Sequence, residues 1–163
     1  MTHTQRDTII LPALGGREPV TSAARIGSLL YSSSIPGMDQ ATGHLADTVE
    51  EQIDLGFRNA RALLDRAGLS PDEVAQLTIF IAKQSDRQRV DRPWLEMVPG
   101  DSRPARKITH AGPPEGQLVQ LQLVAVAGGR RELLSIPGIV DRNPRPLGVR
   151  IGDFIFSSAI GPD

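Results

Sequence analysis

The chain has 163 residues, which is enough for one domain with a hydrophobic core and too short for two full ones. Its 18 basic and 19 acidic residues nearly cancel, so charge gives no reason to expect nucleic acid or a membrane surface as a partner. The chain has no cysteine, which excludes disulfides, thiolate nucleophiles and thiolate metal sites. No stretch approaches the roughly 18 apolar residues of a membrane span and the first residues do not resemble a signal peptide, so we expect a cytoplasmic protein.

Hydrophobic periodicity and turn residues predict two strands, a long helix, a short helix, a third strand, another helix and two final strands. The long helix carries its own end signals, because Thr48 and Glu51 form a capping box and Gly68 stands where a left-handed residue closes a helix. The predicted elements span residues 7–11, 26–35, 49–67, 70–75, 76–83, 86–98, 105–111 and 116–127.

This order predicts an α+β fold with one mostly antiparallel sheet and two main helices on a single face. Strand 76–83 is apolar on both sides, which is typical of a central strand. In strand 116–127, Gln120 and Gln122 alternate with apolar residues. Because two helices cover only one face of a sheet, we expect the face with these glutamines to contact water or a partner subunit.

The end of the chain repeats its beginning. Residues 6–38 align with residues 131–163 without a gap, at a constant offset of 125 positions. Ten of the 33 aligned positions are identical, whereas chance would give about two, so the alignment favours a tandem duplication over unrelated strands of similar composition. The identical pairs are Arg6/Arg131, Pro12/Pro137, Arg17/Arg142, Pro19/Pro144, Arg25/Arg150, Ile26/Ile151, Gly27/Gly152, Ser32/Ser157, Ser33/Ser158 and Ile35/Ile160.

The repeat predicts a domain over residues 1–129 and a partial copy of its opening strands over residues 130–163. The partial copy has no helix after its strands, so it cannot bury a face alone. If the 163 residues are the whole protein, we expect the strands at about 148–160 to add to a sheet edge or to swap onto a neighbouring subunit. If they are a fragment, we expect a longer protein with two such domains.

Four stretches carry a resemblance to a known family. They are "LLYSSSIPGMDQATGHL", "EEQIDLGFRNARALLDRAGLSPDEVAQLTIFIAK", "RPARKITHAG" and "LVQLQLVAVAG", and together they cover most of residues 6–128. In order and spacing they resemble the reactive intermediate deaminase family, also called the Rid, YjgF or L-PSP family. The resemblance implies a chorismate-mutase-like fold and a homotrimer with clefts at its subunit interfaces. Active members hydrolyse enamines and imines to 2-keto acids and ammonia, and they use no cofactor.

The resemblance also implies a substrate site. Arg106 ends the "RPAR" motif and matches the family's substrate-binding arginine, whose planar guanidinium suits a carboxylate. Ile108 on the same strand and Ser33 match positions that line the cleft. Gln122 and Val20 match two further cleft positions, so the candidate catalytic residues are Arg106 and Gln122, and the candidate substrate-binding residues also include Ser33, Val20 and Ile108.

The chain departs from the family's active pattern around this arginine. Gln122 stands where active members carry a glutamate near the attacking water, and an amide can orient water but cannot take its proton. Val20 stands where a tyrosine is usual, Ser34 departs from the Ser-Gly-Gln turn, and Asp91 replaces a frequent asparagine. We therefore expect either a Rid-type deaminase or related hydrolase for a small carboxylate, or a non-catalytic trimeric binding protein for such a ligand.

Two other function classes have little support. His3, His44 and His110 have no metal-ligand spacing, so we expect no metal site. Some relatives are labelled endoribonucleases, but the neutral charge and the few aromatic residues, among them Tyr31 and Trp94, argue against an RNA partner.

Overall fold

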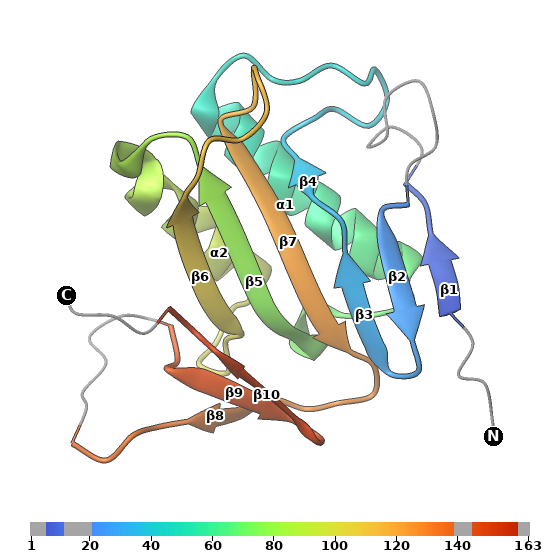
Figure 1. Cartoon of the computed structure of the whole chain (residues 1–163), viewed down its shortest axis with the longest axis vertical. Helices are drawn as coiled ribbons and strands as arrows, with labels where there is room; N and C mark the ends of the chain where they lie inside the picture. The colour runs from blue at the N-terminus through green and yellow to red at the C-terminus, as the bar shows by residue number, and fades with distance from the viewer. Residues whose placement is uncertain (1–5, 12–20, 139–144, 160–163) are drawn as a thin grey trace.

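The computed structural model describes residues 6–11, 21–138 and 145–159 of the chain, and its architecture is α+β (Figure 1). The main sheet has seven strands in the order β1-β2-β3-β7-β5-β6, with the short β4 paired to β7. Neighbouring strands are antiparallel except β5 and β6, so the expected fold class is confirmed. The strands are β1 (Arg6–Ile9), β2 (Ala23–Ile26), β3 (Leu29–Ser32), β4 (Ile35–Pro36), β5 (Val74–Ile81), β6 (Ala105–His110) and β7 (Val119–Val126).

The helices lie behind one face of this sheet, as Figure 1 shows. Thr48 accepts a hydrogen bond from the backbone N–H of Glu51 at 3.3 Å, and Gly68 adopts a φ of 67° just after the helix, so both predicted end signals of α1 operate. In the described part of the chain, no helix is long and apolar enough to cross a bilayer. The helices are α1 (Val49–Arg66) and α2 (Asp91–Met97), with 3₁₀ helices η1 (Pro71–Glu73) and η2 (Gln84–Val90).

The main core lies between these helices and the sheet. Ile53 and Phe57 from α1 and Trp94 from α2 are buried there. Gly56 lets α1 approach β7 closely, because a Cβ at this position would lie 2.7 Å from Leu121 Cδ1. No helix of the described residues lies on the opposite face of the sheet, as the sequence predicts.

Three predicted elements differ from those observed. The predicted strand 26–35 is broken, because Gly27 adopts a φ of 59° and closes a two-residue turn between β2 and β3. The predicted short helix over 70–75 is only the three-residue η1, and β5 begins at Val74. The predicted helix 86–98 is divided between η2 and α2, with Pro93 in the first turn of α2, where its missing N–H is tolerated.

A second, three-stranded sheet follows the main one, in the order β10-β9-β8. It lies across the ends of β5 and β6 in Figure 1. We call residues 130–138 and 145–159 the C-terminal segment. β9 pairs with β8 and β10 pairs with β9, so these strands do not join the main sheet. One backbone hydrogen bond, from Ala159 N to Arg106 O at 3.3 Å, reaches the edge of β6. The strands are β8 (Glu132–Leu134), β9 (Gly148–Ile151) and β10 (Phe154–Ser157).

Candidate functional site

Arg106 lies on β6, one of the two edge strands of the main sheet, with its side chain on the helix-covered face. Across the sheet it is in register with Leu77 and, one strand further, with Leu123, both of which are core residues. Residues in register share a face. Arg106 is only 5% exposed, so this cation is buried beside the core and not solvated at the edge.

The Arg106 guanidinium has two close partners. Its Nη1 donates to Asp91 Oδ1 at 2.6 Å, and its Cζ lies 4.2 Å from the ring centroid of Trp94. Its Nε is buried and makes no hydrogen bond to any described residue. A buried guanidinium with an unpaired N–H carries charge that its partners compensate only in part, and an anion bound beside it would offset that charge.

Neighbouring charges act on the same group. Burial lowers the pKa of Arg106, Asp91 opposes that shift, and the positive charges of Arg145 and Arg87 lower the pKa further. The net direction is downward, which indicates that the surroundings disfavour the guanidinium charge overall. A bound anion would relieve this repulsion.

Arg106 opens into a hollow of about 190 Å³, which we call the Arg106 cavity. It holds three guanidinium groups and, among its described residues, a single carboxylate, that of Asp91. Arg145 Nη1 donates to Ala159 O at 2.8 Å and Arg87 Nη1 donates to Ile108 O at 3.3 Å, so among the described residues both cations are anchored to backbone carbonyls and not to acids. The lining residues are Arg87, Gln88, Asp91, Arg106, Ile108 and Arg145.

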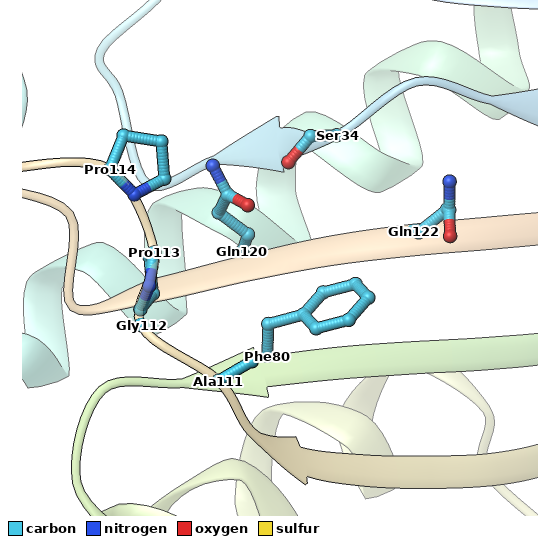
Figure 2. Close-up of a pocket in the computed structure, with 8 residues that line it drawn as sticks. All are labelled: Ser34, Phe80, Ala111, Gly112, Pro113, Pro114, Gln120 and Gln122. Atoms are coloured by element: carbon cyan, nitrogen blue, oxygen red, sulfur yellow. The ribbon is translucent and has the colours of Figure 1, made fainter.

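A second hollow, of about 290 Å³, lies on the face without helices, and we call it the open-face pocket. In Figure 2, Gln120 and Gln122 rise from β7 and Phe80 from β5 on the same side of the sheet, with Ser34 across from them. None of its lining residues is ionisable, so this pocket offers no group for proton transfer. They are Ser34, Phe80, Ala111, Gly112, Pro113, Pro114, Gln120 and Gln122.

The structure separates the residues that the sequence predicts as one site. Arg106 and Ile108 share the Arg106 cavity, whereas Gln122 is in register with Thr78 on the opposite face and lines the open-face pocket. Ser33 is exposed and donates to Thr21 O at 2.6 Å. Val20 lies outside the described residues. Within one chain, Arg106 and Gln122 therefore cannot contact the same small molecule.

Sequence reasoning missed two cations of the Arg106 cavity, Arg87 and Arg145. No sequence motif marks Arg87, because this residue reaches the cavity only through the packing of η2 beside β6. Arg145 does have a signal, since it stands 125 positions after Val20, which was itself a predicted site position. Asp91 was noted only as a departure from the family's asparagine, and the structure makes it the ion-pair partner of Arg106.

Comparisons with known proteins agree with this architecture. Residues 13–127 match the family described as Endoribonuclease L-PSP. A RutC family protein of Pyrococcus abyssi is 24% identical over 109 residues, which cover 66% of this chain and 85% of that protein. A mouse 2-iminobutanoate/2-iminopropanoate deaminase is 28% identical over 112 residues, or 68% of this chain and 82% of the relative. A solved structure from Yersinia pestis, a protein of unknown function of the conserved Rid family, has a TM-score of 0.69 at 25% identity and covers 76% of this chain and 100% of its own.

Proposed function

We propose that this chain, which belongs to the Endoribonuclease L-PSP family of Rid proteins, binds a small carboxylate metabolite in the Arg106 cavity and hydrolyses its C=N bond. The observation that carries the proposal is the buried Arg106, with its unused Nε, in a cavity where guanidinium groups outnumber carboxylates. A guanidinium binds a carboxylate through two parallel N–H···O contacts, which holds the reacting carbon next to it in a fixed place.

The proposed reaction is the hydrolysis of a 2-imino acid. An enamine such as 2-aminoacrylate first tautomerises to the imine, water then adds to C2, and the resulting carbinolamine expels ammonia to leave a 2-keto acid. One water is consumed and one ammonia is released for each substrate, with no change of oxidation state. The protein has to hold the carboxylate, orient the water and manage one proton.

Asp91 is the residue we assign to that proton. Its Oδ1 lies 2.6 Å from Arg106 Nη1, and Asp91 lines the same cavity in which we place the carboxylate of the ligand. The Gln122 amide is neither an acid nor a base near neutral pH, and it lies on the other face of the sheet. In a homotrimer, the Gln122 face of one copy could meet a ligand held by another, and only this water-orienting role of Gln122 depends on such an assembly.

The test is release of ammonia from 2-aminoacrylate generated in situ. We expect release by the unaltered protein, its loss in Arg106→Ala, and no change in Arg66→Ala, which removes an exposed arginine from the end of α1. Asp91→Asn keeps the shape of the side chain and removes its base, so we expect kcat to fall about 100-fold or more while the carboxylate still binds. Equal release by the Arg106→Ala variant would exclude this site.

A second candidate function is binding without chemistry. It is favoured by Gln122, which replaces the family's glutamate, and by the open-face pocket, whose lining offers no ionisable group. In that case a carboxylate would bind at Arg106 and the ammonia assay would stay at background for the unaltered protein. Carboxylate binding that Arg106→Ala abolishes, with no turnover of any imine tested, would establish this alternative.

A further inference from the structure

The C-terminal segment reproduces the pairing of the opening strands residue by residue. β9 and β10 begin and end 125 positions after β2 and β3. The register is also the same, since Ile26 pairs with Leu29 and Ile151 pairs with Phe154. β1 and β8 pair with β2 and β9 at the same offset as well.

Side-chain hydrogen bonds repeat together with the strands. Arg25 Nε donates to Gly27 O at 3.0 Å, and Arg150 Nε donates to Gly152 O at 3.2 Å. Ser33 Oγ donates to Thr21 O at 2.6 Å, and its counterpart in the C-terminal segment makes the equivalent bond to Pro146 O at 2.5 Å. A position in the opening strands can therefore be matched to one in the C-terminal segment by structure as well as by sequence.

The two copies differ in what they contact. Val149 and Ile151 of β9 are fully buried against Ala75, Ala105 and Val126 at the ends of the main sheet. In β2, the counterpart of Ile151 is 52% exposed. The C-terminal segment therefore docks on the main sheet through the face that the opening strands leave uncovered.

This docking brings the C-terminal segment to the backbone of Arg106. Arg106 N donates to Ser158 Oγ at 3.0 Å, and Ala159 N donates to Arg106 O at 3.3 Å. Gln76 Nε2 also donates to Ser157 O at 2.8 Å. The edge of β6 at Arg106 is thus already occupied within the chain, and any second copy that used the same atoms would have to displace the segment.

The same docking brings Arg145 into the Arg106 cavity. Ser158 is the counterpart of Ser33, and Arg145 is the counterpart of Val20. Two positions that the sequence assigns to a cleft around Arg106 are thus represented at Arg106 by residues of the C-terminal segment.

From this arrangement we infer that the C-terminal segment completes the Arg106 site within a single chain, and that Arg145 binds a second anionic group of the ligand. The inference rests on the proposed carboxylate site at Arg106. Within the described residues, neither Arg145 nor Arg87 is paired with a carboxylate, while Arg106 has Asp91. A ligand with one carboxylate bound at Arg106 does not neutralise the charge of Arg145, whereas a small dicarboxylate can neutralise the charges of both arginines.

Trp94 gives a direct readout of binding. It is the only tryptophan in the chain, and its ring lies 4.2 Å from Arg106 Cζ, so an anion that moves or neutralises this guanidinium should change its emission. The probes are succinate, with two carboxylates, and propionate, with one, titrated at equal ionic strength so that salt screening is the same. We expect the unaltered protein to bind succinate at least tenfold more tightly than propionate.

The decisive variant is Arg145→Val, which installs the residue found at the matching position of the first copy. We expect it to bind succinate no more tightly than propionate, because the second carboxylate of succinate loses its partner. Arg150→Val, which removes an exposed arginine from the same segment, should keep the preference for succinate. An unchanged preference in Arg145→Val, or a lack of preference in the unaltered protein, would overturn the inference.

The two proposals fail in different ways in this experiment. Loss of propionate binding in Arg106→Ala together with an unaffected Arg145→Val would leave the Arg106 site standing and remove Arg145 from it. Propionate binding that survives in Arg106→Ala would instead remove the proposed carboxylate site, and with it the role of Arg145.

Discussion

The opening strands and the C-terminal segment share one local structure and have different surroundings. Both contain a hairpin closed by a glycine of positive φ, 59° at Gly27 and 56° at Gly152. β3 continues into the main sheet by pairing with β7, whereas β10 pairs only with β9 among the described strands. The repeated sequence therefore determines the turn of each hairpin and the register of its strands. The neighbouring elements determine which face of each hairpin is buried in a core.

The two arginines at matching positions show the same difference. Arg6 is exposed on β1, at the edge of the main sheet. Arg131, its counterpart, is 7% exposed and donates to Pro71 O at 2.7 Å, to Val74 O at 2.8 Å and to Ser102 O at 3.0 Å. The same side chain is thus a surface group in one copy and an anchor in the other.

The largest effect should come from the isoleucine pair. Ile151→Ala removes a fully buried side chain between the two sheets, and we expect it to lower the free energy of unfolding by about 3 kcal/mol. Ile26→Ala, at the matching exposed position, should change it by less than about 0.5 kcal/mol. Urea denaturation monitored by Trp94 emission measures both. Equal losses would mean that the C-terminal segment is not docked as described.

The arginine pair should give the next largest effect. Arg131→Ala removes the donor from the buried Val74 carbonyl and from the partly buried carbonyls of Pro71 and Ser102, and we expect a loss of about 2 kcal/mol in the free energy of unfolding. Arg6→Ala is the matched control and should be close to neutral. If Arg6→Ala were as destabilising as Arg131→Ala, the distinction between surface group and anchor would be wrong.

The smallest effect concerns pH and the turn after β7 that leads to the C-terminal segment. Glu73 accepts from Gly128 N at 2.6 Å, just after β7, and from Ser70 N at 2.8 Å. Burial raises the pKa of Glu73, but these hydrogen bonds outweigh burial and the net pKa is lowered. A lowered folded-state pKa contributes stability above the unfolded-state pKa, and this contribution is lost as pH falls through the folded-state pKa.

We therefore expect the urea midpoint to fall between about pH 5 and pH 3 partly through Glu73. Glu73→Gln should be less stable than the unaltered protein at neutral pH and should lose part of this pH dependence. The measurement is the urea midpoint of both proteins across that range. Parallel pH profiles would show that Glu73 does not tie the turn after β7 to η1.

Much of the fold could be predicted because it follows from local rules. The capping box at Thr48, the closing glycine after α1 and the alternation along β7 predict their elements directly. The sequence pattern does not predict the break between β2 and β3, because the apolar run continues on both sides of Gly27 and a single glycine does not by itself indicate a turn. The division of the second long helix into η2 and α2 depends on packing against α1 and β6, which the pattern of the sequence does not contain.

The candidate site was predictable only in part. The "RPAR" motif identifies Arg106, but its partner Asp91 and the cations Arg87 and Arg145 come from η2, α2 and the C-terminal segment. Gln122 and Arg106 lie on opposite faces because a strand alternates its side chains, and sequence motifs alone do not assign a face relative to another strand.

The sequence by itself determined the fold class, the ends of α1 and the alignment of residues 6–38 with residues 131–163 at an offset of 125 positions, because periodicity, turn residues and caps act over a few positions. Only the tertiary structure decided that the repeat packs on β5 and β6, that it buries Ile151 and leaves Ile26 exposed, and that it brings Arg145 to Arg106. These contacts join residues far apart in the chain. They depend on which surface remains uncovered after the main sheet and its helices have formed.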